Sequence, residues 1–184
     1  MRNLIVISFA AALAMSGTAL AAASGGNNNN NNGPSPAALL CPEGQVVKIV
    51  VVNGKKKKKC VRIESGIISD EELYQQARSL AKEGHYEWAL KVLAVIQNQD
   101  DPRVLNYTGY SHRKAGRLEI GISYYRKALA INPNFVLARE YLGEGYVAAG
   151  RIDLAKAELA EIALRCGTTC EEYKDLAAAI TGAH

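Results

Sequence analysis

Small and aliphatic residues recur at fixed offsets in three stretches of this chain, and this spacing restricts the fold more than any other feature. Within each stretch the residues lie seven, five and seven positions apart: Ala77, Gly84, Ala89 and Ile96, then Gly109, Gly116, Gly121 and Ala128, then Gly143, Gly150, Ala155 and Ile162. Equivalent residues are 32 and then 34 positions apart (77 to 109, 109 to 143). A period of this length is typical of stacked repeats, and it favours a binding function over catalysis.

The offsets predict a helical hairpin in each stretch. Two small residues on either side of a turn let the axes of two facing helices approach closely. Gly84, Gly116 and Gly150 are the expected turn residues, and each is followed three positions later by an acid, in Glu87, Glu119 and Asp153. We interpret these acids as belonging to the capped start of each second helix.

The second stretch resembles the tetratricopeptide repeat most closely, through the residues Leu105, Gly109, Gly116, Leu118, Gly121, Tyr125, Ala128 and Pro133. The third stretch departs from that family's pattern at its end, where Cys166 and Gly167 replace the proline. The first stretch is two residues shorter, so we expect a tighter junction after its hairpin. Tyr173, Leu176, Ala177 and Ile180 follow at helical spacing, which predicts a capping helix. The prediction is a mainly α solenoid of three such repeats and a cap over residues 70–182.

The amino-terminal residues predict export. Arg2 precedes an apolar stretch from Leu4 to Met15, and small residues follow as far as Ala21. This pattern is typical of a secretory signal peptide, here over residues 1–21. A membrane anchor is the alternative, but the apolar stretch is shorter than the roughly 20 residues of a spanning helix. Residues 22–40, rich in Asn, Gly and Pro, are predicted to be a disordered linker.

The four cysteines fit an exported protein, since an even number in an oxidising compartment favours disulfides. Three pairings are possible. Pairing Cys41 with Cys60 and Cys166 with Cys170 keeps each bond inside one predicted unit. A four-thiolate zinc site is the rival, but Cys41 and Cys60 lack the close spacing of zinc ligands. We expect no metal and no cofactor.

Residues 41–66 predict a small β-hairpin closed by the first disulfide. Val46 to Val52 is β-branched, Asn53 and Gly54 are a strong turn signal, and Lys55 to Ile63 returns. With this turn, Val52 lies opposite Lys55, and Val47 lies opposite Cys60. The bond would then stabilise a hairpin that is marginal alone.

The lysines of the returning strand, Lys55, Lys56, Lys57, Lys58 and Lys59, leave two interpretations open. Removing them together with Arg2 turns the formal net charge from +4 into −2, so the basic character is local. They are solvated charges that protect an exposed strand edge, or they bind an anionic polymer of the envelope by salt-sensitive attraction. An exported protein is a poor candidate for nucleic-acid binding.

The resemblance to tetratricopeptide repeats implies a concave groove lined by the first helix of each hairpin. Counting from the small residues places ten candidate side chains in it: Tyr74, Arg78, Lys82, Arg103, Asn106, Tyr110, Arg113, Lys114, Glu140 and Glu144. The groove is predicted to be basic and aromatic at one end and acidic at the other. Arg and Tyr often dominate binding energy, so an acidic peptide or a chain terminus would suit the basic end. Solvated helix faces are the alternative.

Other functional classes find less support in the sequence. The carboxylate clamp of chaperone adaptors in this family is not intact, because Tyr74, Arg78, Tyr107, Leu137 and Tyr141 stand at its places. No histidine belongs to a recognisable catalytic motif, so we predict that the chain is not an enzyme. Most of the mature chain, together with the predicted signal peptide, resembles small exported tetratricopeptide proteins of Gram-negative bacteria. We expect a periplasmic or secreted adaptor that binds another protein, with self-association possible; an envelope-polymer binder is the alternative.

Overall fold

The computed structural model describes residues 41–42, 44–63 and 66–182; the predicted signal peptide 1–21 and linker 22–40 lie outside them. Two strands precede a series of helices: β1 (Gln45–Val52), β2 (Lys55–Arg62), α1 (Asp70–Lys82), α2 (Tyr86–Leu93), α3 (Pro102–Lys114), α4 (Leu118–Ile131), α5 (Val136–Ala148), α6 (Ile152–Cys166) and α7 (Glu171–Thr181). Within the described ranges, no helix combines the length and apolar character needed to cross a membrane.

The strands form the predicted antiparallel hairpin. Asn53 and Gly54 make the turn with positive φ angles of 53° and 71°, which these residue types tolerate. Val52 pairs with Lys55 and Val47 pairs with Cys60, so the predicted register is confirmed. Cys41 bonds to Cys60 across 19 residues. The disulfide therefore closes the open end of the hairpin.

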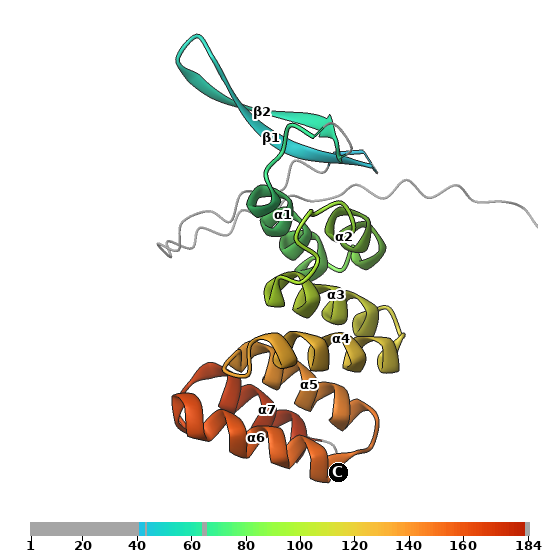
Figure 1. Cartoon of the computed structure of the whole chain (residues 1–184), viewed down its shortest axis with the longest axis vertical. Coiled ribbons are helices and arrows are strands. Elements are labelled where there is room, and N and C mark those ends of the chain that lie inside the picture. The colour runs from blue at the N-terminus through green and yellow to red at the C-terminus, as the bar shows by residue number, and fades with distance from the viewer. Residues whose placement is uncertain (1–40, 43, 64–65, 183–184) are drawn as a thin grey trace, which may run out of the picture. The chain divides into compact units, whose positions relative to one another are not determined.

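The helices pack as successive antiparallel pairs, α1 with α2, α3 with α4 and α5 with α6, and α7 packs on the last pair (Figure 1). Gly84, Gly116 and Gly150 lie between the helices of each pair with φ angles of 90°, 85° and 70°. Such angles strongly favour glycine. The structure confirms the fold class: a helical-hairpin solenoid with a capping helix and a disulfide-closed β-hairpin.

Two glycines let α3 and α4 approach at their crossing. A β-carbon at Gly109 would lie 2.8 Å from the ring of Tyr125, and one at Gly121 would lie 2.8 Å from the carbonyl oxygen of Gly109. At position 143 a glycine is needed for a different contact, because a β-carbon there would lie 2.5 Å from the side chain of Leu176 of α7. The small residues thus serve two close contacts, one within a hairpin and one with the cap.

Two expectations about local structure were wrong. The junction after the first helical hairpin, formed by α1 and α2, is not tighter, since residues 94–101 connect α2 to α3. Helix α2 is shorter instead, with 8 residues against 14 in α4. Nor do side chains cap the second helices, since α2, α4 and α6 have no side-chain cap hydrogen bond. The acids Glu87 and Glu119 instead pair with arginines of the following hairpin.

The core runs from the β-hairpin into the helices. Val46 and Ile63 belong to the same buried cluster as Leu73, Ala77 and Leu80 of α1. This apolar face of α1 is therefore buried in the described structure. Gln76 also bonds to the hairpin backbone, accepting from the Val47 amide at 2.6 Å and donating to its carbonyl at 2.8 Å. These contacts attach the hairpin to the first repeat.

Candidate functional site

Four tyrosines of three first helices form a continuous cluster, which we call the tyrosine cluster: Tyr74 of α1, Tyr107 and Tyr110 of α3, and Tyr141 of α5. The ring centroids of Tyr74 and Tyr107 are 5.9 Å apart, and those of Tyr110 and Tyr141 are 5.1 Å apart. Tyr107 also contacts Tyr110 and Tyr141. All four residues are buried, so the cluster joins three repeats through aromatic contacts.

Cations from α1 lie on this cluster. The Arg78 Nε donates to the Tyr107 hydroxyl at 3.0 Å, and the Lys82 ammonium donates to the Tyr141 hydroxyl at 2.6 Å. Lys82 also lies 5.0 Å from the ring centroid of Tyr110, within cation–π range. Within the described residues, neither Arg78 nor Lys82 has a carboxylate partner. Their charges are held in place by neutral aromatic groups.

The phenols remain neutral near these cations. Burial raises the pKa of Tyr74 to about 12, and burial likewise raises the pKa of Tyr110 and of Tyr141 above the usual value. The Tyr141 hydroxyl therefore accepts its hydrogen bond from Lys82 without supplying a negative charge. The positive charge of Arg78 and Lys82 is left for a partner or for solvent.

The other predicted groove cations differ in their surroundings. Arg103 bonds to Asp101 at 2.7 Å and to Glu71 at 2.9 Å, so its charge is compensated. Arg113 is buried between the Tyr125 hydroxyl, to which it donates at 3.1 Å, and the carboxylate of Glu144. Lys114 is exposed, with its ammonium 5.7 Å from the ring centroid of Tyr110.

Asn106 does not lie at an accessible surface as we expected. Its side chain is fully buried, and neither amide atom has a hydrogen-bond partner in the described structure. The next residue, Tyr107, and its equivalent 34 positions later, Tyr141, accept the bonds from Arg78 and Lys82. The ten predicted groove residues include neither tyrosine, although both stand at places of the family's carboxylate clamp. A count advanced by one position would have found both.

The acidic end of the predicted groove lies on α5. Glu140 is buried, with 5% of its surface exposed, and Glu144 pairs with Arg113. Burial, together with the charges of Glu144 and Asp175, raises the pKa of Glu140 to about 8. A carboxyl with this pKa is mostly protonated at neutral pH.

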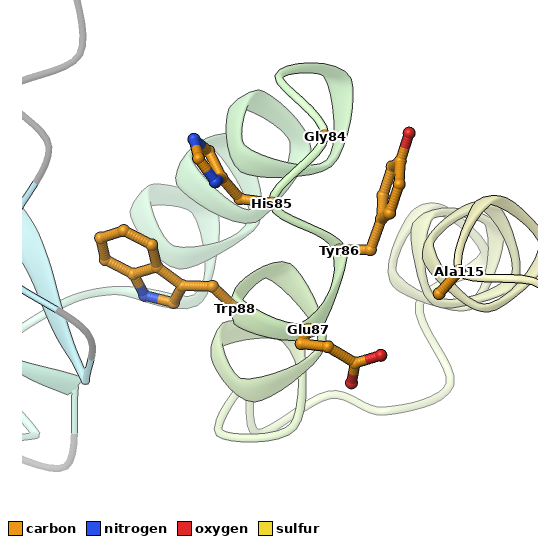
Figure 2. Close-up of a pocket in the computed structure, with 6 residues that line it drawn as sticks. All are labelled: Gly84, His85, Tyr86, Glu87, Trp88 and Ala115. Atoms are coloured by element: carbon orange, nitrogen blue, oxygen red, sulfur yellow. The ribbon is translucent and has the colours of Figure 1, made fainter. Parts of the chain in front are cut away.

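A separate pocket of about 350 Å³ opens at the turn between α1 and α2 (Figure 2). Its lining consists of Gly84, His85, Tyr86, Glu87, Trp88 and Ala115. None of the predicted groove residues lines this pocket. Among the described residues the Trp88 indole nitrogen has no hydrogen-bond partner, while its ring lies 6.2 Å from that of His85.

The remaining predicted residues lie away from the tyrosine cluster. Lys55 to Lys59 are all exposed on β2. Cys166 and Cys170 lie within bonding distance of each other across the end of α6 and the start of α7, as predicted. Glu172 lies beside them and would be the third ligand if this pair held a metal ion. Because the two sulfurs bond to each other, they offer no thiolate to an ion in this state.

Comparison with known proteins agrees with this architecture. Residues 112–180 match the tetratricopeptide repeat family, whereas no curated protein sequence matches the chain. The first such domain of Spaghetti (RPAP3), bound to the HSP90 peptide SRMEEVD, is 15% identical with a TM-score of 0.55; the match covers 62% of this chain and 92% of that one. These matches show the fold.

Two further solved structures are similar over the same region. The type III secretion chaperone SycD of Yersinia enterocolitica, in complex with a peptide of the translocator YopD, is 22% identical with a TM-score of 0.53, covering 65% of this chain and 93% of that one. The TPR2B domain of yeast Sti1, in a complex with pHsp70, is 17% identical with a TM-score of 0.56, covering 62% and 98%. The helical array of this chain therefore has the tetratricopeptide fold.

Proposed function

We propose that this chain is a protein-interaction module that binds an extended segment of a partner protein across the first helices of its repeats. The observation that carries the proposal is the pair Arg78 and Lys82, two cations fixed on buried tyrosines with no carboxylate partner among the described residues. Fixed cations beside aromatic rings suit an acidic group of a peptide, because little side-chain entropy is lost on binding. The chain acts as an adaptor rather than an enzyme.

The similar structures support the choice of a peptide as the ligand. Spaghetti is solved with the HSP90 peptide SRMEEVD and SycD with a peptide of the translocator YopD, and the HSP90 peptide contains three acidic residues. At their low identity, these proteins support the mode of binding but not the identity of the partner. The residues that would hold a peptide here are this chain's own.

Paired substitutions test the proposal. Random peptides displayed on phage would be selected for binding to the tagged full chain and, separately, for binding to a variant with Arg78→Gln and Lys82→Gln. A variant with Lys127→Gln and Lys156→Gln, on the second helices α4 and α6, removes the same charge elsewhere. We expect the native chain and the control to select acidic peptides, and the α1 variant to lose that preference. Equal selection by all three chains would contradict the proposed site.

We further propose that the adaptor works in the periplasm or outside the cell. Support comes from the leader-like residues 1–21 and from the two cysteine pairs, which persist in oxidising compartments. A reporter active only after export, fused after residue 40, should be active with the leader and inactive when residues 1–21 are deleted. Activity that survives the deletion would contradict export through this segment.

An anionic envelope polymer or lipid surface is a second candidate partner, favoured by the exposed β-hairpin. Lys55 to Lys59 are exposed, and none of them forms an ion pair within the described residues. Replacing these five lysines with Gln should abolish sedimentation with anionic polysaccharide at low salt, and native binding should vanish at high salt. Binding that persists in the Gln variant would exclude the lysines as the contact.

A further inference from the structure

Glu140 on α5 is a buried acid without a partner among the described residues of the helical array. Its residue surface is 95% buried, since only 5% is exposed, yet its carboxyl has no hydrogen bond or ion pair with any described residue. Burying a carboxyl without a partner is costly, and an amide or an apolar side chain would suit a purely structural position better. The described fold does not pair this carboxyl, and its oxygens are not among the fully enclosed side-chain atoms that lack a partner, so the carboxyl keeps some contact with solvent.

Three more acids lie near Glu140 and intensify the negative charge. Glu144 lies one turn later on α5, and Glu172 and Asp175 approach from α7. The charge of Lys82 on α1 opposes these acids, but its ammonium already donates to Tyr141. Arg113 of α3 is likewise engaged by Glu144. No described cation from the elements packed around Glu140 pairs with it.

The fold holds these acids together through a close helix contact. Gly143 of α5 lies against Leu176 of α7, where even a β-carbon would come within 2.5 Å of the leucine side chain. Leu176 itself is fully buried. Because Asp175 precedes Leu176 and Glu172 lies one turn earlier, this contact brings both acids toward α5. The packing of α7 on α5 therefore sets the backbone positions from which these two acids approach Glu140.

We propose that Glu140, with Glu144 and Asp175 beside it, binds a lysine or arginine side chain of the partner peptide. The inference rests on the proposed peptide-binding function and specifies its ligand. Arg78 and Lys82 on α1 take an acidic residue, and the site on α5 and α7 takes a basic one. The recognised segment is therefore dipolar, and its two charges fix its direction across the repeats.

Binding a cation at this site is coupled to proton release. Burial and the neighbouring acids keep Glu140 largely protonated at neutral pH, since they raise its pKa to about 8. An arriving ammonium or guanidinium group favours the ionised carboxyl, so a proton leaves Glu140 as the ion pair forms. The peptide thereby replaces the missing partner.

The experiment is a phage selection of random twelve-residue peptides on the full chain, on Glu140→Gln and on the matched control Asp153→Asn of α6. We expect native and control pools to contain a Lys or Arg at a fixed distance from an acid, and the Glu140→Gln pool to lose only the basic residue. The inference would be overturned if the native pool showed no enrichment of Lys or Arg, or if the Glu140→Gln pool showed the same enrichment. Either result would leave the adaptor proposal intact. If no chain selects any peptide, both proposals fail.

Calorimetry with one selected peptide gives a second readout. Replacing its basic residue with norleucine should weaken binding to the native chain about tenfold or more and should leave Glu140→Gln nearly unaffected. In buffers of different ionisation enthalpy at pH 7, native binding should release protons and Glu140→Gln binding should release fewer. Equal loss in both chains would overturn the inference. So would a divalent cation, Mg²⁺ or Ca²⁺, that binds at Glu140 without peptide and competes with it.

Discussion

The β-hairpin and the helical array are stabilised in different ways. The array buries aromatic and aliphatic side chains from every helix, whereas in the two strands only Val46 is fully buried. Ile49 and Val51 are 54% and 66% exposed. The hairpin is held by the Cys41–Cys60 bond and by its contacts with α1. Packing therefore stabilises the array, and a covalent bond stabilises the hairpin.

The largest effect should come from adding a methyl group where α3 and α4 cross. In Gly109→Ala the new β-carbon would lie 2.8 Å from the Tyr125 ring and 3.0 Å from the Gly121 carbonyl oxygen, so the helices must separate. We expect a loss of about 3 kcal/mol in the free energy of unfolding, measured by urea denaturation. Gly182→Ala, at a helix end with its nearest neighbour at 3.4 Å, is the control. An unchanged Gly109→Ala midpoint would show that the crossing is not close.

Removing the first disulfide should affect the hairpin and spare the array. Cys41→Ala with Cys60→Ala removes a constraint worth about 3 kcal/mol to a loop of this length. Amide exchange in β1 and β2 should become much faster, while the helical melting temperature changes little. The matched control is Cys166→Ala with Cys170→Ala, which leaves strand exchange unchanged. A large fall in helical melting with the first pair would mean that the two regions unfold together.

The pH dependence of the free energy of unfolding should reveal the cost of burying the Glu140 carboxyl in the helical array. The folded pKa of Glu140 is raised from 4.5 to about 8, so its stabilising contribution is complete below pH 4.5 and is lost as pH rises through 8. Burial is the main cause of this higher pKa, the charges of Glu144, Asp175 and Glu172 add to it, and the charge of Lys82 opposes it. Glu140→Gln should come closest to the native chain below pH 4.5 and should be at least about 2 kcal/mol more stable at pH 9, because a pKa raised from 4.5 to about 8 is worth up to about 5 kcal/mol. Parallel native and variant curves would show that Glu140 titrates normally.

The fold was largely predictable because the small residues encode it directly. Gly84, Gly116 and Gly150 adopt positive φ angles, and Asn53 with Gly54 fixes the strand register. These features depend on backbone conformations of single turn residues, which the residue types themselves predict. The short α2 was not predicted, because deleting two residues shortens either a helix or a turn, and spacing alone does not decide between them.

The candidate site was less predictable because helix faces depend on rotation about the axis. Counting placed Asn106 at the groove, yet its neighbour Tyr107 receives the Arg78 bond. Glu140 was placed at the acidic end from its position, but its lack of a partner depends on where Lys82 and Arg113 find theirs. The partners that these cations find depend on tertiary contacts, which sequence patterns do not predict.

The smallest effect concerns the ion pairs that repeat between hairpins. Arg117 pairs with Glu87 at 2.6 Å, and Arg151 pairs with Glu119 at 2.6 Å, so one contact recurs at equivalent positions. Both glutamates are more than half exposed, and exposed pairs contribute little because water screens them. A double-mutant cycle with Glu119→Gln and Arg151→Gln should give a coupling of about 0.5 kcal/mol, and less in 1 M salt. A coupling energy above about 2 kcal/mol would show that ion pairs, as well as packing, hold neighbouring repeats together. The helical array would then depend, like the β-hairpin, on specific bonds in addition to its core.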